Sequence, residues 1–485
     1  MRNVKILFFC FIFFLSSFDV CAVDSIEKIK STGQVKMITN AEFPPFEFID
    51  DKGDIKGIDI DISQKIAEEI GVKLNIESVS FDAILLELES GSADFAAAAM
   101  TSSEERSQNF SFSDPYFTTT QRILVKKESK IKSSSDLVGK KIGVAIGTVG
   151  DSYCSSKEGF LEPVRFSKPA DAVSDLINSR LDAVVVDDLT ADQLISGKLD
   201  LIKKTEENLT QEDYVIVVRK NDENFLHIIN EVIAKLKDNG ELQKIFDNYL
   251  SAQTENKKDP QVVADNIYYK YSGLILKGLK NTILITVFSL IVGVFLGTIM
   301  ALFRVAYKEN GRLKFLSLIS KFYVTVIRGT PVIVQLFIVY YVFLSRFGIS
   351  DKFLSAVLTF GVNSGAYVAE IVRSGIISID KGQFEAGYSL GLPYKDVMLN
   401  IIMPQATRNI LPTLISEFIS LLKETSVVGI IGLTDLTRAG DVIRSVTYEA
   451  FTPLLIVAII YLFIVIIFTK MISLLKQRLF KHDIQ

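Results

Sequence analysis

The sequence predicts a two-lobe α/β domain followed by an all-α membrane domain of five helices, and three observations lead to this fold class. Segments with strand and helix character alternate from residue 34 to 250. Long apolar runs fill residues 274–475, whereas the charged residues concentrate between 24 and 260. Residues 1–22 have the pattern of a secretory signal peptide, which delivers the following domain across a membrane.

The signal peptide is predicted from its three regions. Arg2 and Lys5 form a charged start, Ile6–Leu15 is apolar, and Val20-Cys21-Ala22 offers a small-residue cleavage site. Two alternatives stay open: the segment remains uncut as an anchor, or Cys21 carries a lipid. All three place residues 24–260 outside the cytoplasmic membrane.

Composition excludes several classes of function. The formal net charge is −4 and no basic stripe with interleaved aromatic residues occurs, so nucleic acid is not an expected partner. Cys154 is the one cysteine outside the leader and has no partner for an intramolecular disulfide. His227 and His482 stand apart from clusters of carboxylates or cysteines, so no metal site is expected.

The α/β half, residues 24–250, reads as two units. The first unit is expected to contain strands at 34–39, 73–78 and 94–100 and helices at 58–70 and 81–89. A second unit runs from 140 to 200, bracketed by the extended segments Thr118–Val125 and Gln211–Val218. These two crossovers predict an inserted lobe at about 122–212 and hinge closure around a ligand.

A polar linker is predicted at 251–270. Its first part, Ser251–Pro260, is short and ends in proline. About ten extended residues reach at most ~35 Å. The α/β half is therefore tethered close to the membrane half, at an effective concentration on the order of millimolar.

The membrane half, residues 271–478, contains apolar spans of roughly the 20 residues that a bilayer requires. The five spans are expected at about 274–303, 318–345, 354–377, 408–432 and 453–473. Arg328–Pro331 interrupts the second, so that segment should face protein or water. Lysine and arginine residues follow the first, third and fifth spans, which predicts cytoplasmic loops there, a cytoplasmic C-terminus and an extracytoplasmic α/β half.

Short motifs in the α/β half carry a family resemblance. They are Asn40–Phe48, Gly57–Ile62, Asp94–Thr101, Glu104–Arg106, Phe112–Tyr116, Gly147-Thr148 and Asp182–Asp187. Together they resemble the family 3 solute-binding proteins, which are periplasmic amino-acid receptors. The resemblance implies the type II periplasmic-binding-protein fold, with two crossover strands, and an amino-acid-binding domain at 24–250.

The chemistry of an α-amino acid accounts for several of these residues, and the resemblance assigns them the same roles. Arg106 can clamp the carboxylate with its planar fork of donors. The Thr101 hydroxyl and backbone N–H groups near Ala99, Thr101 and Thr148 can add hydrogen bonds. Asp187 offers a counter-charge to the ammonium group.

The ligand side chain is expected between Phe43 and Phe81, with cation–π attraction if it is cationic. Asn40 matches a position that is often acidic in the family, so its neutral amide weakens the case for a cationic ligand. Glu42 or Glu47 are the alternative sources of negative charge.

Structural alternatives accompany three of these assignments. Arg106 follows Glu104-Glu105 and an ion pair on a helix is the competing role. The alternative role of Phe43 is packing in the hydrophobic core. Either Asp187 or Asp188 is expected to serve only as a loop or cap residue.

The membrane half resembles the polar amino-acid permeases of ATP-binding-cassette importers. The resemblance rests on Gly278–Thr282, Arg328–Phe337, Ala366–Gly375, Pro404–Ala406 and Leu422–Ser426. The charged residues Glu370, Arg373, Lys423 and Glu424 lie within or beside spans, where helix–helix ion pairs and a solute path are equally expected.

The segment 381–404 between two spans resembles the coupling loop of these permeases, which docks into a groove on a separate ATPase. The matching residues are Glu385, Ala386, Gly391 and Pro404. Gly387 departs from the usual alanine and Met403 from the usual leucine.

These features predict the receptor and permease subunit of an ATP-dependent amino-acid importer in a bacterial cytoplasmic membrane. The sequence has no phosphate-binding loop, so ATP and magnesium are expected on a partner ATPase, with no cofactor or enzyme activity in this chain. Five spans form half a path, which predicts a homodimer, or a pair with a similar permease. A ligand-gated channel and a transmembrane sensor are the alternatives.

Overall fold

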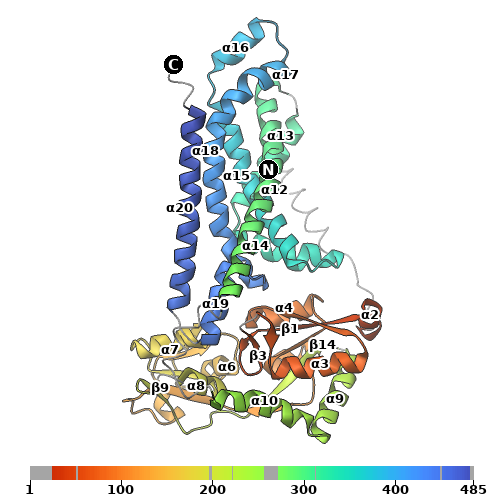
Figure 1. Cartoon of the computed structure of the whole chain (residues 1–485), viewed down its shortest axis with the longest axis vertical. Helices are drawn as coiled ribbons and strands as arrows, with labels where there is room; N and C mark the ends of the chain where they lie inside the picture. Colours follow the sequence, from red (N-terminus) through yellow and green to blue (C-terminus); the bar gives the residue numbers. More distant parts are fainter. Residues whose placement is uncertain are drawn as a thin grey trace.

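The computed structural model shows an α/β body at one end of a long helical body (Figure 1). It describes residues 25–50, 53–195, 199–220, 222–255, 271–311, 313–447 and 451–480. The predicted signal peptide and linker residues 256–270 lie outside these ranges. The first linker residues, 251–255, form the end of helix α10 (Glu241–Glu255) and are not an irregular tether.

The first lobe is built on a sheet with the strand order β5-β1-β6-β14-β7, and β8 also pairs with β14. The strands are β1 (Gln34–Thr39), β5 (Lys73–Ser78), β6 (Phe95–Thr101), β7 (Phe110–Phe112), β8 (Phe117–Thr119) and β14 (Glu212–Arg219). Helices α2 (Ser25–Thr32), α3 (Ile58–Ile70), α4 (Ile84–Glu89), α9 (Glu223–Asp238) and α10 belong to this lobe. Strand β6 is rich in buried alanine because helices cover both of its faces.

The second lobe has the strand order β11-β10-β12-β9-β13. Its elements are β9 (Gln121–Lys126), β10 (Ile142–Ala145), α6 (Val149–Ser156), β11 (Val164–Phe166), α7 (Pro169–Ile177), β12 (Ala183–Asp187), α8 (Asp188–Ile195) and β13 (Ile202–Lys204). The chain enters this lobe between Thr119 and Gln121 and returns to the first sheet at Glu212, which pairs with Thr119. This two-lobe topology with two crossovers confirms the predicted fold class.

A small antiparallel sheet of β2 (Glu42–Phe43), β3 (Glu47–Ile49) and β4 (Ile55–Lys56) lies beside the cleft. Gly57 joins this sheet to α3 with a φ of 139°, a conformation that side chains rarely adopt. A Cβ atom at Gly57 would lie 2.0 Å from the carbonyl oxygen of Phe46. The chain can therefore approach Phe46 this closely only with glycine at position 57.

We expect Gly57→Ala to destabilise the α/β body by about 3 kcal/mol, the upper end for a strained backbone residue. That corresponds to a fall in Tm of roughly 6–12 °C, measured on the full chain by circular dichroism. Gly33→Ala is the matched control, because Gly33 also has a positive φ (67°) but nothing lies within 4 Å of its Cβ position. An equal effect of both changes would contradict the close-contact explanation.

The membrane half is helical, as predicted. Its main helices are α12 (Ser272–Asn310), α13 (Lys314–Arg328), α14 (Val332–Phe337), α15 (Lys352–Ile377), α18 (Met403–Glu424), α19 (Leu436–Thr447) and α20 (Thr452–Phe480). Among the described residues, three helices are long and apolar enough to cross a membrane: 272–308, 352–377 and 452–471. A pair of helices bent by 107°, 314–328 and 332–347, makes a fourth span if counted as one.

Two of the five predicted spans are not continuous apolar helices, and the span predicted at 408–432 is not among the helices apolar enough to cross a membrane. The second is broken at Gly329–Pro331, where the sequence placed the interruption. The span predicted at 408–432 is helix α18 followed by a 3-10 turn at Thr425–Ile431. Charged residues on α18, among them Arg408, Glu417 and Lys423, lower its apolar character.

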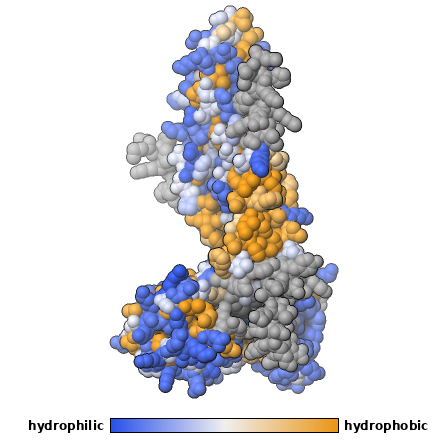
Figure 2. Space-filling model, turned by 60° about the vertical axis from the view of Figure 1, so that its left-hand side comes forward, coloured by the Kyte–Doolittle hydropathy of each residue, from blue (hydrophilic) through white to orange (hydrophobic). Residues whose placement is uncertain are grey.

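The helices separate the two polar ends of the molecule. The α/β body lies at one end, next to α19, whereas α16 (Lys381–Ser389) and α17 (Tyr394–Asp396) lie at the far end (Figure 1). Apolar surface gathers on the helices directly above the α/β body, whose own surface is largely hydrophilic (Figure 2). The membrane helices carry exposed large apolar side chains, among them Phe295 of α12 and Phe463 of α20.

Candidate functional site

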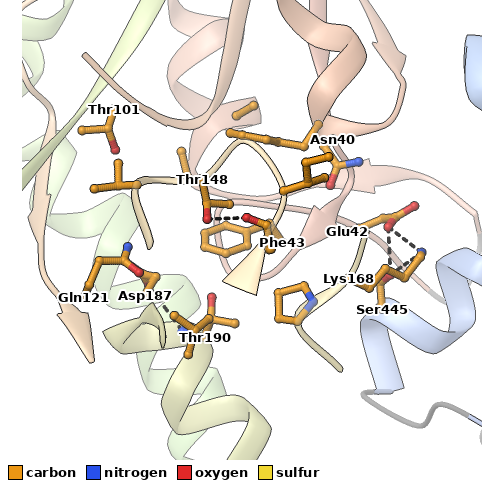
Figure 3. Close-up of a pocket in the computed structure, with 18 of the residues that line it drawn as sticks. Asn40, Glu42, Phe43, Thr101, Gln121, Thr148, Lys168, Asp187, Thr190 and Ser445 are labelled. Carbon is orange, nitrogen blue, oxygen red and sulfur yellow. Dashed lines mark hydrogen bonds and ion pairs between the residues drawn. The ribbon is translucent and has the colours of Figure 1, made fainter. Parts of the chain in front are cut away.

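A cavity of about 130 Å³ lies between the two lobes. All eight residues predicted to bind a ligand line it: Asn40, Phe43, Phe81, Ala99, Thr101, Arg106, Thr148 and Asp187. Figure 3 shows five of them by label, facing the space between the lobes. The structure therefore brings together residues that are spread over almost 150 positions of the sequence.

One end of the cavity is suited to a carboxylate. Arg106 donates from Nη1 to the carbonyl of Thr101 at 2.6 Å and from Nη2 to the carbonyl of Gly147 at 2.9 Å. Gly147 belongs to the second lobe, so the guanidinium spans the cleft. Thr148 caps the start of α6, accepting a hydrogen bond from Asp151 N at 3.4 Å. An arginine fork beside a helix N-terminus favours an anionic ligand group.

Another part of the cavity wall carries two carboxyl groups, those of Asp187 and Glu212. Asp187 is buried, and its Oδ2 accepts hydrogen bonds from the hydroxyls of Thr119 at 2.7 Å and Tyr214 at 2.6 Å. Its Oδ1 accepts from the N–H groups of Leu189 and Thr190 at the start of α8. Burial raises the pKa of Asp187. Asp187 is thus both a helix cap and a cavity carboxylate.

A second carboxylate in this wall, Glu212, was not predicted. It is buried and accepts from Gln121 Nε2 at 3.3 Å, and burial together with the charge of Asp187 raises its pKa. The feature of the sequence that could have indicated Glu212 is its position in the predicted crossover segment at 211–218. Asp188 pairs instead with Arg122 at 2.7 Å and with Lys204, which assigns the purely structural role to Asp188.

Aromatic rings and an amide form the third part of the cavity. Phe43 stacks on Phe46 with centroids 5.9 Å apart, so Phe43 both packs against the core and lines the cavity. Phe81 is partly buried and also lines the cavity. Asn40 donates from Nδ2 to the carbonyl of Val79 at 2.6 Å. This bond fixes the amide and leaves its carbonyl oxygen to accept from a ligand.

The predicted donor role of the Ala99 backbone is corrected by the structure. Its N–H group donates to Asp59 Oδ2 at 2.8 Å and is not available to a ligand. Ala99 has a φ of 44°, unusual for a residue other than glycine, and the β6–β14 register shifts nearby. Burial raises the pKa of Asp59 to about 6.

The two other candidate acids have different surroundings. Glu42 forms ion pairs with Lys168 at 2.8 Å and Arg438 at 2.6 Å. Burial alone would raise the pKa of Glu42, but the two cations have the larger combined effect and lower it. Glu47 is completely buried and lines the cavity beside Asp59. Burial, with the charge of Asp59, raises the pKa of Glu47 well above its usual value. No cationic side chain among the described residues pairs with Glu47.

The predicted coupling loop is a helix, a turn and a short second helix at the far end of the molecule. Of the four matching residues, Glu385 and Ala386 lie in α16, Gly391 lies in the turn, and Pro404 lies at the start of α18. Asp380 caps α16 by accepting from Gly382 N at 2.7 Å. Gly391 turns the chain with a φ of 77°.

The departure at Gly387 has a packing reason. Gly387 is buried, and a Cβ atom there would lie 2.8 Å from Cγ2 of Val397. Glu385 and Ala386 beside it are exposed, as is the side chain of Leu390. The missing methyl group lets α16 lie close to the segment before α18, and the face with Glu385 stays open.

A two-lobe receptor with this cavity, joined to membrane helices, defines a solute-binding protein fused to a permease. Comparison with known proteins identifies both parts. Residues 35–252 match the bacterial extracellular solute-binding proteins, family 3, and residues 293–481 match the binding-protein-dependent transport system inner membrane components. The chain belongs to these families, and it is a fused binding and permease component of an amino-acid ABC transporter.

Individual relatives resemble one half each. The arginine transport system permease protein ArtQ of Bacillus subtilis (strain 168) is 39% identical over 210 residues, 43% of this chain and 94% of that protein. The probable histidine-binding protein of Neisseria gonorrhoeae is 33% identical over 238 residues, 47% of this chain and 88% of that protein. A crystal structure of a T. maritima ArgBP mutant is 39% identical, covering 47% of this chain and 99% of that one, with a TM-score of 0.44.

The two matched families are solute-binding proteins and transport-system membrane components and not enzymes, and the permease match makes the chain a multi-pass inner-membrane protein.

Proposed function

We propose that this chain captures an L-amino acid outside the cytoplasmic membrane and passes it to its own membrane domain, driven by a separate ATPase. One observation carries the proposal: Ser445 of α19, in the permease, lines the receptor cavity together with receptor residues. Ligand site and membrane helices are thus in contact within one chain.

The arrangement of the two ends supports the orientation. The receptor and α16 lie at opposite ends of the helices (Figure 1), as an extracytoplasmic receptor and a cytoplasmic coupling helix require. The basic residues that follow the first, third and fifth predicted spans favour the same orientation, with a cytoplasmic C-terminus. The exposed face around Glu385 and Leu390 suits a groove on an ATPase, which would hold ATP and magnesium.

A second copy of the chain would complete the path. Arg328, at the break of the second span, is exposed in the single chain and lies over the ring of Tyr367 at 5.0 Å. A charged side chain at this depth is costly against lipid and stable beside protein or water. We therefore place Arg328 toward the path or the dimer interface. Glu370 pairs with Arg304 and Arg373, which favours helix–helix ion pairing for these groups.

The cavity favours an amino acid with a cationic side chain. Arg106 would bind the α-carboxylate of this ligand, and Asp187 would bind its α-ammonium group. Among the residues that the structure describes, none then offers Glu47 a cation, and Asn40 presents an acceptor oxygen. A guanidinium or ammonium group between the aromatic rings would supply both the charge and the donors that this end of the cavity lacks.

We expect the full chain in nanodiscs to bind arginine or lysine more tightly than glutamine, measured by calorimetry. Glu47→Gln should weaken arginine binding by at least about tenfold, or roughly 1.4 kcal/mol, because the ligand cation loses its buried counter-charge, and should change glutamine binding little. Because the pKa of empty Glu47 is raised, a bound cation would ionise it and release a proton. Arginine affinity should therefore fall as the pH falls, and this dependence should disappear in Glu47→Gln. Equal losses for both ligands would contradict the assignment.

Ligand-stimulated ATP hydrolysis tests the importer role. The chain, reconstituted with its ATPase subunit, should hydrolyse ATP several-fold faster with a bound amino acid than without. Hydrolysis that ignores every amino acid the receptor binds would contradict the proposal.

A further inference from the structure

Four side chains from three separate parts of the molecule meet at the edge of the ligand cavity. Glu42 belongs to the first lobe, Lys168 to the second lobe, and Arg438 and Ser445 to helix α19 of the permease. Figure 3 shows Glu42, Lys168 and Ser445 beside the cavity, joined by their contacts. We call these four residues the clasp.

Each contact in the clasp crosses between parts. The Lys168 ammonium lies 2.8 Å from Glu42 Oε2, 2.7 Å from the Ser445 hydroxyl and 2.8 Å from the carbonyl of Asp441 in α19. The Arg438 guanidinium lies 2.6 Å from the other oxygen of Glu42. Ser445 also donates to Glu42 Oε2 at 2.8 Å. The Glu42 carboxylate thus contacts the second lobe through Oε2 and the permease through both Oε1 and Oε2.

The clasp is largely buried. Lys168, Arg438 and Ser445 are 9%, 8% and 7% exposed, and the Glu42 side chain is 9% exposed. Buried charges are stable when all partners are present and costly when one is missing. The clasp therefore favours the state in which both lobes and α19 are together over states with one partner absent.

Three other receptor–permease contacts each involve a single lobe. Lys352 at the start of α15 pairs with Glu77 at 2.7 Å, and Tyr340 donates to Glu87 at 3.1 Å, both on the first lobe. Arg444 of α19 pairs with Asp171 on the second lobe. A first-lobe contact such as that of Lys352 holds the receptor whether the cleft is open or closed.

We propose that the clasp links cleft closure to docking: Glu42 engages Lys168 and Arg438 together only when the receptor is both closed and seated on α19. This inference rests on the proposed function and adds a mechanism to it. A ligand that favours closure then strengthens docking, and docking strengthens ligand binding by the same factor, because coupling between two equilibria is reciprocal. Loss of the clasp would separate the two events.

The test compares two permease-side changes, neither of which alters a receptor residue. Arg438→Gln removes one partner of Glu42, and Lys352→Gln removes a contact to the first lobe alone. In full-length chain in nanodiscs, calorimetry with arginine, or with the amino acid that the wild type binds best, should show about tenfold weaker binding for Arg438→Gln, within the usual range of coupling between sites. Lys352→Gln should stay within twofold of the wild type.

Two further variants separate linkage from misfolding. Arg438→Lys keeps the charge and should recover part of the affinity, which a general folding defect would not allow. Ser445→Ala removes a hydrogen bond and no charge, and should weaken binding by about two- to fivefold, the value of one such bond.

Each outcome decides the proposal. Equal affinities for wild type, Arg438→Gln and Lys352→Gln would overturn the linkage and leave the importer function standing. Equal losses in both variants would assign the effect to docking in general and also overturn it. A wild-type chain that binds no amino acid would overturn the proposed function, and the linkage with it.

Discussion

Arg106→Ala should abolish detectable amino-acid binding by the full chain. The guanidinium is expected to hold the ligand carboxylate, and it also donates to the carbonyls of Thr101 and Gly147 on opposite lobes. Truncation removes the ligand contact and one bond across the cleft. Loss of a charged, partly buried hydrogen-bonding group costs about 2–5 kcal/mol, or roughly 30- to 5,000-fold in affinity.

Calorimetry against arginine and glutamine measures the loss. Arg180→Ala is the matched control, since Arg180 pairs with Asp175 on the surface of the second lobe and should leave affinity unchanged. Arg106→Lys keeps a positive charge and loses the planar fork, so it should recover little of the affinity. Near-normal binding by Arg106→Ala would exclude Arg106 as the carboxylate ligand and refute the orientation of the amino acid in the cavity.

Glu385→Lys should stop transport while ligand binding stays intact. Glu385 is exposed on α16, at the end of the molecule remote from the receptor (Figure 1). A reversed charge would oppose a partner surface that is complementary to the carboxylate, and like charges facing each other across an interface cost several kcal/mol. We expect at least tenfold slower uptake and a loss of ligand-stimulated ATP hydrolysis.

The neutral variant Glu385→Gln separates charge from shape, because it keeps the size of the side chain and should retain part of the activity. Ligand affinity, measured on the same preparations, should match the wild type in both variants. Wild-type uptake by Glu385→Lys would show that α16 does not contact the ATPase through this carboxylate.

The grouping of four cavity residues follows a rule of parallel sheets. Asn40 follows β1, Thr101 ends β6, Thr148 follows β10 and Asp187 ends β12. Within each sheet the carboxyl ends of parallel strands meet at one edge, and ligands gather there. Two of these residues come from the sheet of each lobe, so the rule accounts for their place at the cleft, whereas the sequence pointed to them through family motifs and ligand chemistry.

Other features depend on contacts that no local pattern records. Glu42 and Lys168 are 126 residues apart, and Lys168 and Ser445 are 277 apart. In sequence, each is one charged or polar residue among many on a hydrophilic surface. The left-handed backbone of Ala99 is likewise invisible in a run of alanines, which is why its N–H group was predicted as a ligand donor and is bonded to Asp59 instead.

The apolar spans were predictable where composition alone decides, as in α12, α15 and α20. Helix α18 is less apolar because it carries charged residues, and it packs against α15 within the bundle. Of these residues, Glu417 is partly buried and accepts a hydrogen bond from Ser364 of α15 at 2.9 Å, whereas Arg408 and Lys423 are exposed. Hydropathy alone therefore does not identify α18 as a membrane span.

ATP-dependent uptake by the reconstituted pair tests the central claim most directly. Proteoliposomes should contain this chain and its ATPase subunit, with ATP on the side of α16 and labelled arginine on the side of the receptor. We predict accumulation that requires both ATP and the ATPase, with no separate binding protein added, and that Arg106→Ala abolishes. Uptake without the ATPase, or uptake that needs an added receptor protein, would contradict the account.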